Sequence, residues 1–130
     1  MPTPYDRIGG EPTIAAIANR FYDLIEQDPA YADLRAIHAA DLSAIRRGLI
    51  RFLAGWAGGP RDWFERGQCV MSLHRAFPIT PALADQWADA MTCAIAAQPG
   101  LDPYLGKAMG EALGHMARSM VNLSLEQSAA

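Results

Sequence analysis

A helical pattern stands out in residues 80–95, which read TPALADQWADAMTCAI. The stretch opens with Thr80 as a cap and Pro81 in the first turn, where the missing proline N–H costs no hydrogen bond. Apolar residues then return every three or four positions, as they do on the buried side of a helix. This apolar stripe comprises Leu83, Trp87, Ala90, Met91, Ala94 and Ile95. The stretch therefore predicts a long helix that begins at Pro81.

Three other stretches carry the same periodicity. One follows Pro12, one follows Asp41 as its cap, and one begins at Asp102 and Pro103. No stretch alternates apolar and polar residues as a half-buried strand does. The sequence therefore predicts an all-α fold with four long amphipathic helices, in one domain that spans residues 1–130.

The rest of the chain is arranged around these helices. Two looser stretches, residues 28–40 and 61–79, separate them, and a frayed tail is expected at the end of a core that spans about residues 5–122. A plain helical bundle needs only a short loop between neighbouring helices. Long irregular segments in compact domains tend to carry function, so residues 61–79 are the first place to look for a site.

Composition and charge exclude several classes of protein. Of the 130 residues, 51% are hydrophobic and 19% are charged, and the formal net charge is −3. Without a basic surplus, neither nucleic acid nor a membrane surface is expected as a partner. Cys69 and Cys93 form no Cys-x-x-Cys pair and the first residues resemble no signal peptide, so we expect reduced thiols in a cytoplasmic protein.

The histidines are the main candidates for chemistry, because no serine-hydrolase, nucleotide-binding or zinc-protease motif is present. His74 lies among apolar residues, where an imidazole needs partners for its nitrogens. The residues alone leave two interpretations open. His74 is either a hydrogen-bonded core residue or the single neutral imidazole that a haem iron takes as its axial ligand.

Five motifs, in order along residues 5–122, resemble those of the second group (O-type) of truncated haemoglobins. They are Tyr5-Asp6-x-Ile8-Gly9-Gly10, Phe21-Tyr22, Gly58-Gly59-Pro60, His74-x-x-Phe77-x-Ile79 and Asp85-x-Trp87-x-x-x-Met91. The resemblance implies a shortened globin, with a two-over-two sandwich of helices around a haem. In that family the histidine-bearing region is largely a loop, which accounts for the length of residues 61–79.

The resemblance also implies roles for residues near the iron. His74 would be the proximal ligand through its Nε2 atom, with its other nitrogen hydrogen-bonded to fix the ring. Tyr22 and Trp87 would donate hydrogen bonds to a ligand on the distal side, and His38 would be a third polar donor. Core packing and ligand contact are compatible for Trp87, since a buried indole N–H needs a partner.

Other positions would form the walls and the edge of the haem site. Ile45 and Leu49 match the distal helix face, and an apolar residue stands at Ile45 where many globins have a histidine or glutamine. Phe52 and Phe77 would pack on the macrocycle, although each would also pass as ordinary core. The candidates for contact with the haem propionates are Arg46, Arg47, Arg66 and Arg75. Because Cys-x-x-Cys-His is absent, the expected cofactor is non-covalent haem b.

Three functions are consistent with these residues. The first is reversible binding of dioxygen or another diatomic molecule, such as nitric oxide or carbon monoxide, at a five-coordinate iron with high affinity. The second is a redox enzyme at the same iron, for nitric-oxide dioxygenation or peroxide reduction, which would need an external reductase. The third is a haem-free helical interaction module. The chain is expected to be a monomer or a homodimer.

Overall fold

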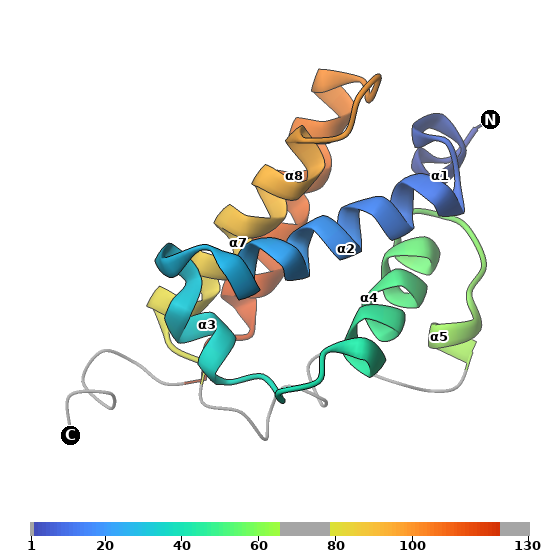
Figure 1. Ribbon diagram of the computed structural model, residues 1–130. Helices are drawn as coiled ribbons and strands as arrows, with labels where there is room; N and C mark the ends of the chain where they lie inside the picture. Colours follow the sequence, from blue (N-terminus) through green and yellow to red (C-terminus); the bar gives the residue numbers. More distant parts are fainter. Residues whose placement is uncertain (1, 66–78, 123–130) are drawn as a thin grey trace.

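The computed structural model describes residues 2–65 and 79–122, and these residues form helices and no strand. In chain order the elements are α1 (Pro4–Ile8), α2 (Glu11–Gln27), the 3-10 helix η1 (Pro29–Tyr31), α3 (Ala32–Ala36), α4 (Ser43–Trp56), α5 (Asp62–Glu65), α7 (Pro81–Ala96) and α8 (Pro103–Ser119) (Figure 1). The predicted all-α class is confirmed. No helix in this part of the chain is long and apolar enough to cross a membrane. The expected frayed tail, residues 128–130, lies outside the described residues.

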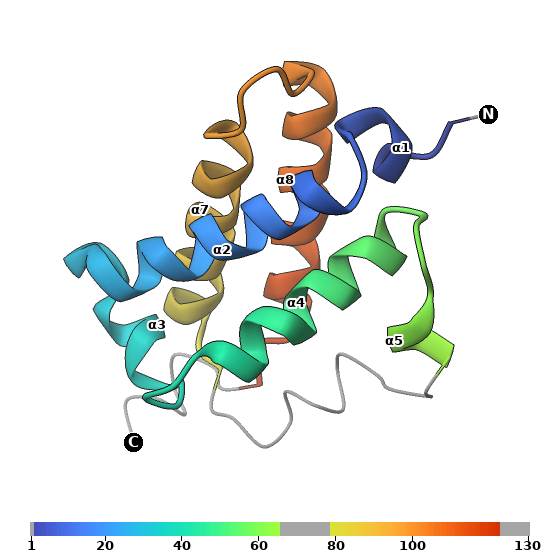
Figure 2. The same cartoon turned by 45° about the vertical axis from the view of Figure 1, so that its right-hand side comes forward.

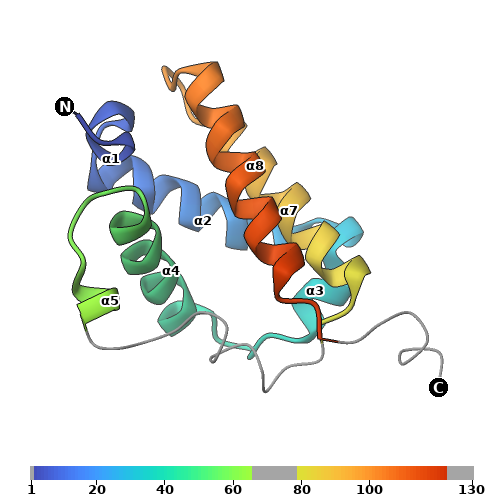
Figure 3. The same ribbon diagram turned by 180° about the vertical axis from the view of Figure 1, so that it is seen from behind.

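The long helices form two layers. α7 and α8 run antiparallel and make the most extensive contact in the described chain. Figure 2 shows α2 crossing in front of this pair, with α4 beside α2 in the same layer, and Figure 3 shows the α7–α8 layer from behind. Since α2 contacts both α7 and α4, it joins the two layers. This is the predicted two-over-two sandwich.

The predicted helix caps were correct at two of three positions. The Thr80 hydroxyl accepts a hydrogen bond from the Leu83 N–H at 3.2 Å, so the cap before α7 is confirmed. Asp102 caps α8 in the same way. The prediction for Asp41 was wrong by one residue, because Leu42 is the N-cap of α4 and makes no side-chain hydrogen bond. Asp41 instead accepts hydrogen bonds from the backbone N–H and the hydroxyl of Ser43, which forms a turn before the helix.

The first looser stretch contains two short helices that the sequence analysis did not predict. Residues 28–40 include η1 and α3, and both are tied to α7. The Tyr31 hydroxyl donates to the Asp89 carboxylate at 2.6 Å, and the Leu34 backbone N–H donates to the Gln86 side-chain oxygen at 3.2 Å. These bonds fix the chain between α2 and α4 against the other layer.

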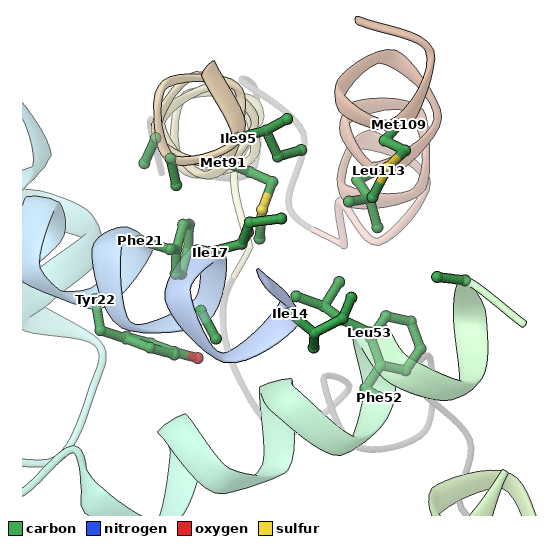
Figure 4. Close-up of a cluster of buried hydrophobic side chains, with 14 of the residues drawn as sticks. Ile14, Ile17, Phe21, Tyr22, Phe52, Leu53, Met91, Ile95, Met109 and Leu113 are labelled. Carbon is green, nitrogen blue, oxygen red and sulfur yellow. The ribbon is translucent and has the colours of Figure 1, made fainter. Parts of the chain in front are cut away.

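The core lies where the two layers meet. Figure 4 shows Ile17 and Phe21 on α2 pointing toward Met91 on α7, with Leu53 of α4 on the other side. The side chains buried most completely are Phe21, Ile14, Ile17, Ile25, Leu53, Met91 and Leu113. Phe21 has no exposed surface, while its neighbour Tyr22 points toward the space between α2 and α4 (Figure 4). The core therefore orients the adjacent residue on α2 toward that space.

Candidate functional site

A cavity of about 370 Å³ lies between α4 and the ends of α7 and α8. Most of its walls are apolar, with few polar side chains among them. The lining residues are Tyr22, Leu34, Ile37, His38, Ile45, Gly48, Leu49, Phe52, Trp63, Ile79, Leu83, Ala84, Trp87, Leu113, Met116, Ala117 and Met120. The three that the sequence analysis placed on the distal side, Tyr22, His38 and Trp87, lie together on this cavity.

Tyr22 is held between aromatic and charged neighbours. Its ring meets Phe21 edge-on at a centroid distance of 4.9 Å and His38 at 6.0 Å, and the Arg46 guanidinium lies 5.7 Å from the ring centroid. Only 3% of the residue is exposed. Burial raises the pKa of the Tyr22 phenol well above its ordinary value, and the Arg46 charge opposes part of that shift. Tyr22 therefore stays a neutral hydrogen-bond donor at any physiological pH.

Trp87 brings an indole N–H from α7 to the same cavity. Its ring packs against Phe21 at 5.2 Å, so one core residue supports both Trp87 and Tyr22. Within residues 2–65 and 79–122, no hydrogen bond is made by the Tyr22 hydroxyl or by the Trp87 N–H. Neither atom is sealed off, because no unpartnered polar side-chain atom in that part is fully buried. Both groups are therefore available to a molecule in the cavity.

His38 lies just after α3 and is oriented by a carbonyl of that helix. Its Nδ1 lies 2.7 Å from the Leu34 carbonyl oxygen. A carbonyl only accepts hydrogen bonds, so in the neutral ring the proton is on Nδ1 and Nε2 is an acceptor. The predicted role of third donor to a ligand therefore requires the doubly protonated ring.

The α4 wall is apolar and partly open. Ile45 is 41% exposed at the rim, and Leu49 and Phe52 follow it along the helix. Phe52 packs edge-on against Trp63, at a centroid distance of 5.2 Å. Gly48, between Ile45 and Phe52, presents backbone alone to the cavity. No side chain on this wall offers a hydrogen bond.

The described arginine candidates do not line the cavity. Arg46 forms an ion pair with Asp23 of α2 at 2.9 Å, and its other terminal nitrogen donates to the backbone and side-chain oxygens of Asn19. Arg47 is exposed. The remaining predicted site residues, His74, Phe77, Arg66 and Arg75, lie outside the described residues.

Sequence reasoning missed several lining residues. Leu83, Leu113, Met116 and Met120 follow the apolar periodicity of the last two long helices, and periodicity cannot distinguish a packed face from a cavity wall. Trp63 carried a possible signal, as a large aromatic residue in an otherwise irregular stretch. Gly48 carried none.

The cavity fits a flat apolar group such as the predicted haem. Ligand sites are concave and mostly apolar, with a few placed polar groups that set orientation. Here the donors lie on the α2–α7 side, the opposite wall is smooth, and one position of that wall has no side chain. This arrangement can hold a macrocycle and still direct two N–H or O–H groups at a small molecule beside it.

Comparisons with known proteins give one consistent result. A family model described as bacterial-like globin matches residues 3–123. A cold-adapted truncated haemoglobin from the Antarctic marine bacterium Pseudoalteromonas haloplanktis is 34% identical, with a TM-score of 0.88 over 93% of this chain and 98% of that one. A group II 2-on-2 haemoglobin from Agrobacterium tumefaciens is 32% identical, with a TM-score of 0.88 over 94% and 95%. A truncated oxygen-avid haemoglobin from Bacillus subtilis is 29% identical, with a TM-score of 0.80 over 93% and 100%.

Proposed function

Because this chain belongs to the bacterial-like globin family, as a truncated haemoglobin of group II, we propose that it holds non-covalent haem b in the cavity beside α4 and binds dioxygen there with high affinity. Globins bind haem and small diatomic ligands. The particular residues and the high affinity are the proposal. The similarity to a Bacillus subtilis protein described as oxygen-avid supports the proposed high affinity.

Haem, when bound, supplies an iron that takes one protein ligand and one small diatomic molecule. His74 is the proposed protein ligand. It is the histidine of the motif that resembles the proximal segment of the family. The apolar cavity walls from α4, α7 and α8 would limit the access of water to the group.

The observation that carries the proposal is the pair of unpartnered donors. Tyr22 and Trp87 both line the cavity, their polar atoms make no hydrogen bond within the described residues, and both groups stay protonated. They would favour a small ligand that carries partial negative charge. A hydrogen bond to a charged group contributes about 1.5–3 kcal/mol. Each donor should therefore slow oxygen release by about tenfold to a hundredfold.

Because the α4 wall is apolar, hydrogen bonds to a ligand would come from the α2–α7 wall. Ile45, Leu49 and Phe52 can contact a ligand only through carbon. His38 in its neutral form accepts at Nε2 and does not add to the pair of donors. The proposed affinity therefore depends on Tyr22 and Trp87 together.

The test is a haem titration followed by absorption spectroscopy in the ferric, ferrous and carbon monoxide states. We expect wild-type protein to take one haem per chain and to give a five-coordinate ferrous spectrum that changes with carbon monoxide. His74→Gly should lose this spectrum and regain it when free imidazole is added, which separates ligation from folding. An unchanged spectrum in His74→Gly without imidazole would contradict the assignment.

A further inference from the structure

Most glycines inside the long helices are explained by what lies next to them. A Cβ added at Gly55 would come within 2.8 Å of the Phe64 ring, and one at Gly106 within 2.7 Å of Leu101. A Cβ added at Gly110 or Gly114 on α8 would lie 3.3 Å from an atom of Thr92 or Ala88 on α7, which is a crowded contact. In these four cases neighbouring atoms of the protein leave little room for a side chain.

Gly48 is different. A Cβ built there meets no atom of residues 2–65 or 79–122 within 4 Å, and the φ angle of Gly48 is not positive. The residue lies near the middle of α4, where glycine is less favourable than any ordinary residue except proline. Neither backbone geometry nor packing within the described chain explains why this helix carries it.

The position of Gly48 supplies a reason. It comes three residues after Ile45 and four before Phe52, so the three residues share one face of α4. All three line the cavity. The empty space beside Gly48 is therefore on the side of the helix where the proposed haem lies.

We infer that Gly48 is a cofactor-contact position, at which the bare backbone of α4 lets the edge of the macrocycle lie against the helix. The inference rests on the proposed haem site. A side chain at this position would fit the protein without haem and would occupy space that haem needs. Gly48 thus sets the depth to which the cofactor enters the cavity.

The test compares haem loss from loaded protein, measured by transfer to an excess of a haem acceptor, in wild type, Gly48→Ala and Gly48→Leu. We expect loss to accelerate about fivefold in the alanine variant and about tenfold or more in the leucine variant, as extra carbons overfill the site. Both substitutions improve helix propensity, so urea unfolding of the haem-free chain should show equal or greater resistance. Faster haem loss, together with a haem-free chain that is at least as stable as wild type, would identify Gly48 as a cofactor contact.

Two control substitutions on α4 separate effects on helix stability from effects on the cofactor contact. Ala44→Gly lowers helix propensity at an exposed position that does not line the cavity, so it should reduce stability and leave haem loss within about twofold of wild type. Gly55→Ala should destabilise the haem-free chain, because its Cβ would strike Phe64.

The outcomes distinguish the inference from its premise. Wild type that takes no haem would overturn both. Wild type that takes haem, with both Gly48 variants retaining it as well as wild type, would overturn the inference alone. Slower binding of carbon monoxide in Gly48→Leu without faster haem loss would also overturn it, since that result describes a ligand entrance.

Discussion

The two walls of the cavity differ in polarity and in packing. The wall from α2 and α7 carries Tyr22 and Trp87, which line the cavity while their rings pack against Phe21 in the centre of the core. The wall from α4 carries only carbon, with a glycine at Gly48 and an exposed rim. The donor side chains are oriented by the tightly packed core, and the empty volume of the cavity lies beside the more open α4 wall.

This division suits a site that must hold a large flat group and also discriminate among small ligands. Hydrogen bonds are useful only when their donors are held within a narrow range of positions, which close packing supplies. A cofactor that enters from outside needs a wall without protruding groups. The comparison predicts that substitutions on the two walls will affect different measurements.

The largest effect on stability is expected from Phe21→Ala. Phe21 has no exposed surface and contacts both donor rings, so its loss leaves a cavity between α2 and α7. We expect about 3–5 kcal/mol of lost unfolding free energy, measured by urea denaturation. Phe52→Ala, on the α4 wall, should cost less because that ring already borders an empty space. Equal losses at the two positions would remove the distinction between the walls.

The second effect is alkaline destabilisation through Tyr22. Burial raises the pKa of the folded-state phenol above the unfolded value of about 10. Its contribution to stability is therefore full below pH 10 and declines as pH rises above that, because the unfolded chain ionises first. The slope due to this one group should approach about 1.4 kcal/mol per pH unit. Unfolding free energies at pH 9–11 should fall less steeply in Tyr22→Phe, and identical slopes would show that Tyr22 is not buried.

The smallest effect on stability is expected from the ion pair that links α4 to α2. Arg46 on α4 bonds Asp23 on α2, with 22% and 43% of their side chains exposed. Removing this partly exposed pair with Arg46→Ala should lower the unfolding free energy by up to about 1 kcal/mol. Arg51→Ala is the matched control, because Arg51 is exposed on α4 and makes no ion pair within the described residues. A loss in Arg51→Ala equal to that in Arg46→Ala would assign the effect to helix surface charge.

The sequence predicted those features that depend on neighbouring residues along the chain. Thr80 with Pro81, and Asp102 with Pro103, act within one turn, so both helix starts were correct. The family motifs added Tyr22, and they gave a second role to Trp87, which periodicity alone would have assigned to the core.

What could not be predicted depends on contacts between distant segments. The short helices η1 and α3 are too brief for periodicity and are held by Asp89 and Gln86 on α7. The guanidinium of Arg46 faces α2 because Asn19 and Asp23 lie there, 27 and 23 residues earlier. The role of Gly48 emerges only when the space beside it is seen to be empty.

The central claim is that hydrogen bonds from the α2–α7 wall retain the ligand. Its most direct test is the rate of oxygen dissociation from the ferrous, haem-loaded protein in wild type, Tyr22→Phe, Trp87→Phe and Leu49→Met. The account predicts that release accelerates about tenfold to a hundredfold in each donor variant and changes little in Leu49→Met, which alters the α4 wall without changing its polarity. Release at the wild-type rate from both Tyr22→Phe and Trp87→Phe would contradict it.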